Sequence, residues 1–202
     1  MNTYHQVLIA GFGGQGVLTC GQILALAAMT EGKHVTWMPS YGPEKRGGTA
    51  HCVVTLSNRQ IGSPLMEKLS GALIFNKPSL VKFDPRLRDG SLVILNSCMV
   101  KAYAGQGNLL VGHVPADKIA QKVGLRRAGN IVMLGAYIAA SSVVSIEAAQ
   151  EAIIKYLGPA KQDLVEVNRK ALIAGRRYVS GIGARRVRLQ TATLPARAGN
   201  YF

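Results

Sequence analysis

The sequence has few acidic residues and few cysteines. Only 10 of its 202 residues are Asp or Glu, against 24 Lys or Arg, so the formal net charge is +14. Such an excess favours anionic partners, such as nucleic acid, phosphorylated cofactors or acidic proteins. The three cysteines, Cys20, Cys52 and Cys98, are far apart and include no CxxC pair. Their spacing offers neither an iron–sulfur nor a zinc cradle, so we expect three reduced, half-buried thiols and no metal ligands.

Long hydrophobic runs are also lacking. The longest, from Ile131 to Val144, is too short and too interrupted to span a bilayer, and the polar start MNTYHQ does not resemble a signal peptide. With 48% hydrophobic residues, the composition is that of a globular protein. We expect a cytoplasmic protein without a membrane partner, built as one domain over residues 1–180 with a basic C-terminal tail over 181–202. From Arg169 onward there is no Asp or Glu, which fits either a solvated tail or a strap onto another subunit or an acidic redox protein.

Several catalytic motifs are absent. The sequence contains no GxSxG nucleophile elbow, no HExxH metal site and no P-loop, and its four histidines are scattered. We therefore expect no catalytic residue in this chain alone.

Hydrophobic runs and helical periodicity predict an α/β fold: a Rossmann-like, mostly parallel sheet flanked by helices, with a helical C-terminal part. A strand over His5–Gly11, a helix over Val17–Glu31 and a strand over His34–Met38 form a β-α-β unit, and we expect its sheet to be parallel. The next strand, His51–Leu56, is followed by a turn, and Arg59–Ile61 is expected to return as an antiparallel hairpin.

The rest of the chain supplies further strands and helices. Asp89-Gly90 is expected to form a turn before a strand, and Ser145 is expected to cap a helix. The remaining predicted strands are Leu69–Phe75, Ser91–Asn96 and Leu109–Val114, and the remaining helices are Ser79–Phe83, Ala116–Val123, Asn130–Ala140, Ile146–Leu157 and Leu164–Tyr178.

A glycine-rich turn joins the first strand to the first helix. Gly11, Gly13 and Gly16 fit GxGxxG, a pattern that lets backbone N–H groups and a helix N-terminus approach a phosphate. The second strand ends without the Asp or Glu that a nicotinamide dinucleotide site needs for the ribose, which disfavours a dehydrogenase. The glycines alone also suit helix–strand packing. Gly14 and Gln15 go beyond that need and favour an anion site.

A second loop, predicted over Pro39–Thr49, follows the second strand at the same carboxyl edge of the sheet. Arg46 suits a phosphate or carboxylate clamp and Glu44 an orienting or partner contact, although a local ion pair between them is the simpler interpretation. Gly47 and Gly48 permit close backbone approach, and Tyr41 suits stacking at the rim. We expect the two loops to face each other across one crevice.

The two motifs together carry a family resemblance. GFGGQGVL, then PSYGPEKRGGTAHC, then IGSP (Ile61 to Pro64) resemble the gamma subunit of 2-oxoacid:ferredoxin oxidoreductases, most of all its 2-oxoglutarate and branched-chain members. The resemblance covers roughly Val7 to Tyr178 and includes Asn76 and the segments SLVILN, VPADKIA and GNIVMLGA. It implies that residues 1–180 form a pyruvate/ketoisovalerate oxidoreductase gamma-type domain. Lys45, at a position often apolar in relatives, departs from the pattern, and the arginine-rich tail is not part of it.

The resemblance further implies a division of labour. Thiamine-binding alpha and beta subunits hold thiamine diphosphate and magnesium, a ferredoxin-like subunit carries iron–sulfur clusters, and an acidic ferredoxin accepts electrons. The complex would decarboxylate a 2-oxoacid, with 2-oxoglutarate the predicted substrate, and form an acyl-CoA. This chain is expected to hold no cofactor alone and to contribute to receiving coenzyme A. Carried over, the site residues are Gly11, Gly13, Gly14, Gln15, Gly16, Tyr41, Glu44, Arg46, Gly47, Gly48 and Thr49.

Two other functions remain open on the sequence alone. The charge of +14 suits a nucleotide- or RNA-binding module with a basic tail, but the tail offers few aromatics to interleave with its basic residues, and we expect no nucleic-acid partner. An independent dehydrogenase would bind NADH or NADPH, and saturable quenching of the fluorescence of Trp37, the only tryptophan, would indicate that binding.

Overall fold

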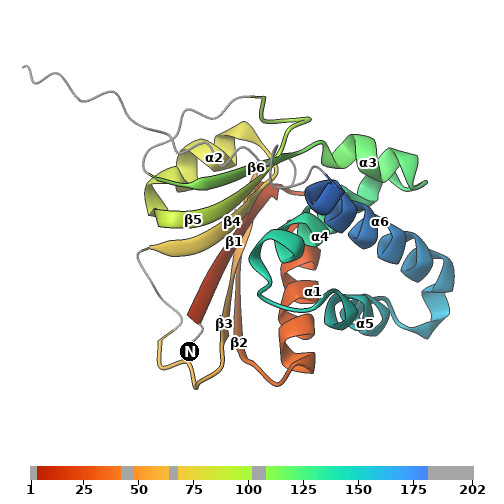
Figure 1. Cartoon of the computed structure of the whole chain (residues 1–202), viewed down its shortest axis with the longest axis horizontal. Helices are drawn as coiled ribbons and strands as arrows, with labels where there is room; N and C mark the ends of the chain where they lie inside the picture. Colours follow the sequence, from red (N-terminus) through yellow and green to blue (C-terminus); the bar gives the residue numbers. More distant parts are fainter. Residues whose placement is uncertain (1–3, 42–47, 64–67, 102–107, 182–202) are drawn as a thin grey trace, which may run out of the picture.

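The computed structural model describes residues 4–41, 48–63, 68–101 and 108–181. Within them a central sheet separates two unequal layers of helices (Figure 1). The strands are β1 Tyr4–Phe12, β2 His34–Tyr41, β3 Thr49–Ser57, β4 Leu69–Ile74, β5 Leu87–Asn96 and β6 Leu110–Val114. The helices are α1 Val17–Thr30, α2 Lys77–Phe83, α3 Ala116–Lys122, α4 Gly129–Ser141, α5 Ile146–Leu157 and α6 Gln162–Gly181, with short 3-10 turns at Asp84–Arg86, Arg126–Ala128 and Pro159–Lys161. None of the helices formed by these residues is both long and apolar enough to cross a membrane.

The strand order is β2-β3-β1-β4-β5-β6. The ladders β1–β4, β4–β5 and β5–β6 are parallel, whereas β3 pairs antiparallel with both β1 and β2. The predicted α/β class and mostly parallel sheet are therefore confirmed. The first two strands run parallel, as expected of a β-α-β unit, but they are not adjacent, because β3 lies between them and pairs antiparallel with both.

Three local expectations need correction. The antiparallel hairpin is β2–β3, and Arg59–Ile61 does not form a strand. Pro39 lies within β2 and not in the loop; β2 is an edge strand, where a residue without an N–H is tolerated. Asp89-Gly90 lies inside β5, where the register with β4 jumps from Leu69↔Leu87 to Gly71↔Leu92 and Gly90 has a φ of 78°. The expected turn is thus an irregularity in a continuous strand.

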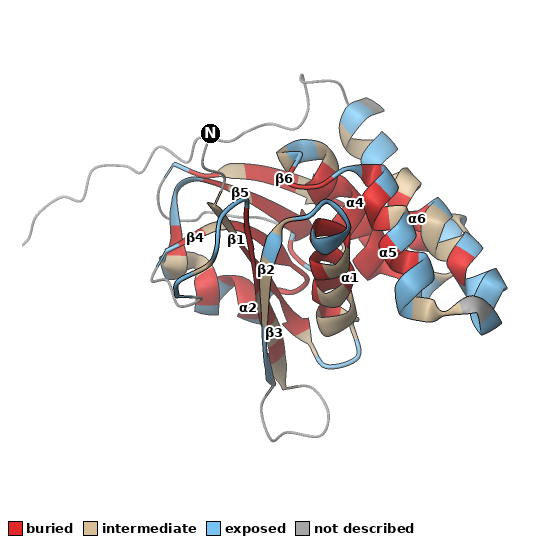
Figure 2. Cartoon of the chain, turned by 90° about the horizontal axis from the view of Figure 1, so that it is seen from below, coloured by how far each residue is buried: buried red, intermediate tan, exposed pale blue. Residues whose placement is uncertain are grey.

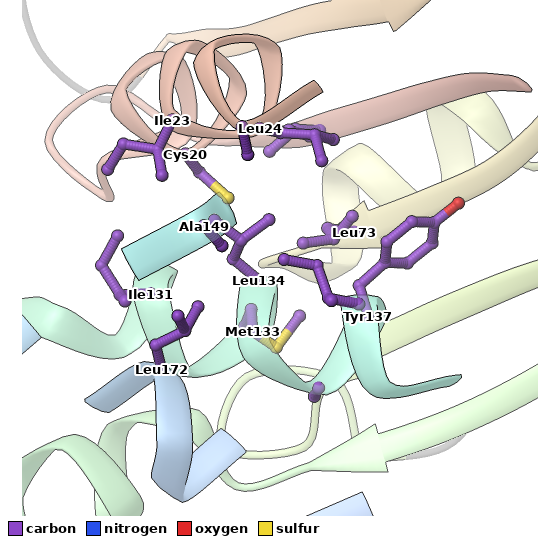
Figure 3. Close-up of a cluster of buried hydrophobic side chains, with 14 of the residues drawn as sticks. Cys20, Ile23, Leu24, Leu73, Ile131, Met133, Leu134, Tyr137, Ala149 and Leu172 are labelled. Carbon is purple, nitrogen blue, oxygen red and sulfur yellow. The ribbon is translucent and has the colours of Figure 1, made fainter. Parts of the chain in front are cut away.

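One face of the sheet carries the larger core. It packs against α1 and α4, and α5 and α6 lie behind these two helices, whereas α2 covers the other face (Figures 1 and 2). Figure 3 shows Leu134 and Tyr137 of α4 between the sheet and the outer helices. Helix α4 is buried from Gly129 to Ile138. A helix buried on all sides cannot show an amphipathic stripe, and α4 acts as the central support of the domain.

Helices α4 and α6 approach closely through two glycines. A Cβ added at Gly135 would collide with the backbone of Leu172, and one added at Gly175 would collide with the backbone of Val132. At the sheet, a Cβ at Gly71 would lie 2.9 Å from Cζ of Tyr137. Burial of Tyr137 raises the pKa of its phenol well above the ordinary value. The absence of a side chain at Gly71, Gly135 and Gly175 therefore allows α4 to pack closely against both the sheet and α6.

Candidate functional site

The first glycine loop divides into packing glycines and open glycines. A Cβ at Gly11 would lie 2.9 Å from both the Phe75 Cβ and the Val17 Cγ2, and one at Gly16 would lie 2.8 Å from the Asn130 Cγ. Gly16 also has a φ of 72°, in the left-handed region that favours glycine. Gly11 and Gly16 are therefore required for close packing of the loop against neighbouring side chains.

Gly13 and Gly14 have a different environment. A Cβ at either position would meet no atom within 4 Å, although Gly14 has a φ of 91°. The loop backbone is therefore approachable from outside at these two residues. Open space beside a backbone is what a phosphate needs to reach N–H groups.

Gln15 braces the loop from within. Its Oε1 accepts a hydrogen bond of 2.7 Å from the Phe12 N–H and one of 3.1 Å from Asn76 Nδ2. Asn76 is 1% exposed, and its Oδ1 accepts from the Ser79 N–H and so caps α2. The side-chain amide of Gln15 thus ties the turn after β1 to the start of α2 after β4.

The second loop ends beside the first. The Gly13 N–H donates to the Gly48 carbonyl oxygen at 3.2 Å, and Phe12 pairs with Thr49 across the β1–β3 ladder. The expected juxtaposition of the two turns therefore holds at Gly48. The loop is shorter than predicted, since Tyr41 ends β2 opposite Ala50 and Thr49 opens β3. Glu44, Arg46 and Gly47 lie outside the described residues, as does the side chain of Tyr41.

A cleft of about 330 Å³ opens next to the first loop. It lies at the carboxyl ends of the parallel neighbours β1 and β4, where the chain leaves β1 toward α1 on one face and leaves β4 toward α2 on the other. Open α/β sheets bind ligands at this position. It is lined by Gly14, Gln15, Phe75, Asp117, Arg126, Arg127, Gly129 and Asn130. The first residues of α4 and the residues just before α1 thus meet at one opening, with two exposed arginines at its rim.

The interior side of this cleft is polar and ordered. Asn130 is 7% exposed and its Nδ2 donates to the Gly16 carbonyl oxygen at 3.0 Å, which fixes α4 against the start of α1. The Asp117 carboxylate accepts a 3.0 Å hydrogen bond from Asn96 Nδ2, and Asn96 is 1% exposed. Two positive helix ends and two arginines outweigh this one carboxylate, so the cleft suits a phosphate or carboxylate ligand.

The cysteines and histidines lie outside this cleft. Cys20 and Cys52 are fully buried, which corrects the expectation of half-buried thiols, and Cys98 is partly exposed; all three are free. Desolvation raises the pKa of the Cys20 thiol well above its usual value and that of Cys52 to about 12. Such thiols stay protonated and unreactive. Within the described part of the chain, no group of three or more His, Cys, Asp or Glu side chains is placed to hold a metal ion.

Sequence reasoning did not assign Asp117, Arg126, Arg127 or Asn130 to the site. They follow the last strand, more than 100 positions after the first glycine loop, and no short motif links them to it. The available signal was the paired arginines of LRRAGN directly before a helix, combined with the rule that ligands bind at the carboxyl ends of parallel strands.

The fold and the cleft define an α/β domain with an anion-receptive glycine loop at the point where its strand order reverses. The chain belongs to the family described as pyruvate ferredoxin/flavodoxin oxidoreductase, which matches residues 6–178. The resemblance seen in its two motifs is thereby confirmed.

Two curated relatives illustrate the match. The chain is 39% identical over 173 residues to the ketoisovalerate oxidoreductase subunit VorA of Methanothermobacter thermautotrophicus, covering 86% of this chain but only 36% of that relative. It therefore spans about a third of the length of that protein. It is 33% identical over 181 residues to the 2-oxoglutarate synthase subunit KorC of Methanothermobacter marburgensis, covering 86% of this chain and 96% of that relative.

A solved structure shares the fold. The gamma subunit of a keto/oxoacid ferredoxin oxidoreductase from Geobacter sulfurreducens superposes with a TM-score of 0.75 at 30% identity, over 87% of this chain and 98% of that one.

Proposed function

We propose that this chain is the gamma subunit of a thiamine-diphosphate-dependent 2-oxoacid:ferredoxin oxidoreductase and is not catalytic by itself. Family membership over residues 6–178 and similarity to chains named as subunits of such enzymes support the proposal. Thiamine-binding alpha and beta subunits and a ferredoxin-like subunit would be its neighbours, an acidic ferredoxin the electron acceptor, and the cytoplasm its location. Thiamine diphosphate, held with magnesium by those subunits, supplies the decarboxylation chemistry.

The role of this chain in the proposal is to hold phosphate groups of coenzyme A. The observation that carries it is the cleft where Gly14 and the start of α4 meet beneath Arg126 and Arg127. Each part fits a diphosphate: open backbone at the loop, two positive helix ends, and guanidinium groups able to form charge-assisted hydrogen bonds. The cleft would hold only a part of so long a ligand, which leaves the thiol end free to reach a neighbouring subunit.

The predicted 2-oxoacid is 2-oxoglutarate, and relatives of both the 2-oxoglutarate and the ketoisovalerate type are similar to this chain. Substrate choice is measured directly in the complex co-purified with this chain. Acyl-CoA formation and ferredoxin reduction are followed with 2-oxoglutarate and with 3-methyl-2-oxobutanoate. The substrate with the higher kcat/KM identifies the member class, and turnover of neither would contradict the proposal.

The phosphate-binding role is tested in the same complex with Arg127→Gln. Losing one charged hydrogen bond to a phosphate should raise the KM for coenzyme A about tenfold or more, because such a bond contributes about 1.5–3 kcal/mol. The KM for the 2-oxoacid should stay unchanged. Arg59→Gln is the matched control, since Arg59 is exposed and follows Ser57, which pairs with Tyr4 at the opposite end of the sheet. An unchanged KM for coenzyme A in Arg127→Gln would refute the assignment.

Arg46→Ala tests the second loop, which the structure does not describe at that residue. We expect a raised KM for coenzyme A or loss of assembly with the partner subunits. Size-exclusion chromatography separates the two outcomes, and unchanged assembly with unchanged kinetics would remove Arg46 from the site.

A further inference from the structure

A second, larger depression lies away from the coenzyme cleft, among the outer helices. Its volume is about 880 Å³, and α3, α5 and α6 form its walls. Along α6 its lining recurs every three or four residues from Glu166 to Tyr178, a stripe of about 18 Å at 1.5 Å per residue. We call it the α3–α6 groove. Its lining residues are Ile119, Lys122, Val123, Gln150, Glu166, Arg169, Lys170, Ile173, Ala174, Arg177 and Tyr178.

The floor of the groove is apolar. Ile119 of α3 and Val123 at its C-terminal end line the groove together with Ile173 and Ala174 of α6, and all four are partly buried. Burial of this half-exposed apolar floor under another apolar surface lowers the free energy. Its length of about three helical turns matches a short amphipathic helix laid along α6.

The rim of the groove is cationic and incompletely paired. It carries Lys122, Arg169, Lys170 and Arg177 against one acid, Glu166, which forms an ion pair with Lys170 at 3.6 Å. Among the described residues, the other three cations form no ion pair. The Nε of Arg169 is buried and has no hydrogen-bond acceptor within the described part of the chain. Three cations without an ion-pair partner, beside an apolar floor, favour a partner that carries carboxylates next to apolar side chains.

We propose that the α3–α6 groove docks an acidic amphipathic helix of another polypeptide. Apolar side chains of that helix would cover the floor, and its carboxylates would meet Lys122, Arg169 and Arg177. The inference goes beyond the coenzyme site and does not depend on it, because the groove shares no lining residue with the cleft.

The charge and the composition of the groove disfavour three other occupants. The chain's own residues 182–202 contain Arg185, Arg186, Arg188 and Arg197 and no acid, so they match the groove in sign. A second copy carries the same net charge of +14 and is repelled. Nucleic acid would stack on aromatic side chains, of which the groove contains Tyr178 alone.

The test uses the full-length chain and a synthetic helical peptide of about 18 residues, long enough to hold a helix in water. The peptide carries Leu every three or four positions and Glu on the flanks, and a version with Gln for Glu is the neutral control. Binding is measured by fluorescence anisotropy over a range of salt concentrations. A single-stranded RNA of similar length is the third probe.

Lys122→Glu combined with Arg177→Glu should weaken binding of the acidic peptide at least about tenfold, because two attractive contacts become repulsive. Arg59→Glu with Arg88→Glu is the matched control, with equal charge change at exposed positions outside the groove; it should change the affinity less than about twofold. Both double variants replace exposed side chains, so their unfolding temperatures should match that of the unmodified chain.

The proposal is supported if the acidic peptide binds, the neutral peptide binds at least about tenfold more weakly, and only the groove variant loses affinity. It is overturned if both double variants weaken binding equally, which would indicate attraction by net charge alone. Equal binding of the Gln peptide would also overturn it. So would RNA binding more tightly than the peptide and depending on the same two residues, which would assign the groove to nucleic acid.

Discussion

The three neighbouring glycines Gly13, Gly14 and Gly16 permit a graded test of which positions serve packing and which serve a ligand. Alanine at Gly16 must adopt a φ of 72°, which costs about 1–2 kcal/mol. Its Cβ would also displace the Asn130 side chain, whose hydrogen bond to the Gly16 carbonyl contributes about 1 kcal/mol. We therefore expect Gly16→Ala to lower the free energy of unfolding by about 2–3 kcal/mol.

The other two glycines are the internal controls. Gly14→Ala carries only the backbone term of about 1–2 kcal/mol, because its Cβ meets nothing within 4 Å. Gly13→Ala carries neither term and should stay within about 0.5 kcal/mol of the unmodified chain. For a domain of this size each kcal/mol lowers the unfolding temperature by about 2–4 °C. The expected losses are therefore about 4–12 °C for Gly16→Ala, about 2–8 °C for Gly14→Ala and near zero for Gly13→Ala.

Coenzyme A affinity should follow a different order. A methyl group at Gly14 enters the space through which a phosphate would approach, so Gly14→Ala should weaken coenzyme A binding to the complex by about tenfold despite its moderate effect on stability. Thermal unfolding of the purified chain and calorimetric titration of the complex give the two readouts. Equal unfolding temperatures for Gly13→Ala and Gly16→Ala would refute the packing argument. Unchanged coenzyme A affinity in Gly14→Ala would refute the ligand argument.

Three further predictions concern the supports of the site. Asn76→Asp keeps the side-chain oxygen that caps α2 but loses the donor to Gln15, so it should raise the KM for coenzyme A and change the unfolding temperature little. Asn76→Ala loses both hydrogen bonds and should lower the unfolding temperature as well as the affinity for coenzyme A. Equal effects of the two variants would contradict this assignment. Gly175→Ala should lower the free energy of unfolding, measured by chemical denaturation, by about 3 kcal/mol, because its Cβ would collide with α4. Gly62→Ala is the control and should leave the free energy of unfolding unchanged, since a Cβ at Gly62 meets no atom within 4 Å. Similar values for the two variants would show that α4 and α6 can move apart without cost. Burial lowers the pKa of His5, His51 and His113 below 6.5, so the unfolded chain binds protons at a higher pH than the folded chain does. The free energy of unfolding should therefore fall as the pH drops from about 7 to 5. His51→Gln should make this pH dependence shallower, and an unaltered pH dependence would exclude His51 as a contributor.

Much of the fold was predictable because local rules and tertiary packing agree. Ser145 is the N-cap expected from its position, accepting from the Ala148 N–H at 3.1 Å, and α5 begins and ends at the predicted residues Ile146 and Leu157. Strand order was not predictable from the same signals. A buried strand has a continuous apolar sequence whichever strand it pairs with. The sequence of residues 49–57 therefore does not indicate that β3 lies between β1 and β2.

The candidate site was half predictable for a related reason. The glycine loop is a contiguous motif, and its open residues, Gly13 and Gly14, were found by pattern. Arg126 and Arg127 reach the same cleft only because α4 folds back under the end of β1, a long-range arrangement that composition and spacing do not encode. Gln15 was expected to serve an anion, whereas its side-chain oxygen binds Phe12 and Asn76. A polar side chain in a motif can thus brace the loop that presents the backbone.

Helix α4 connects the two surfaces to which function is assigned. Its first turn lines the cleft beside the first glycine loop through Asn130. Its middle, at Gly135, fixes how closely α6 approaches and so shapes the α3–α6 groove. Because α4 is packed on all sides whereas α6 lies on the outside, a Cβ added at Gly175 should displace α6 and leave α4 in place. A substitution at Gly175 should therefore disturb the groove strongly, while the Asn130–Gly16 hydrogen bond should persist. A variant at Gly175 should therefore lose affinity for the acidic helix at the α3–α6 groove while it keeps its affinity for coenzyme A, even though α4 supports both surfaces.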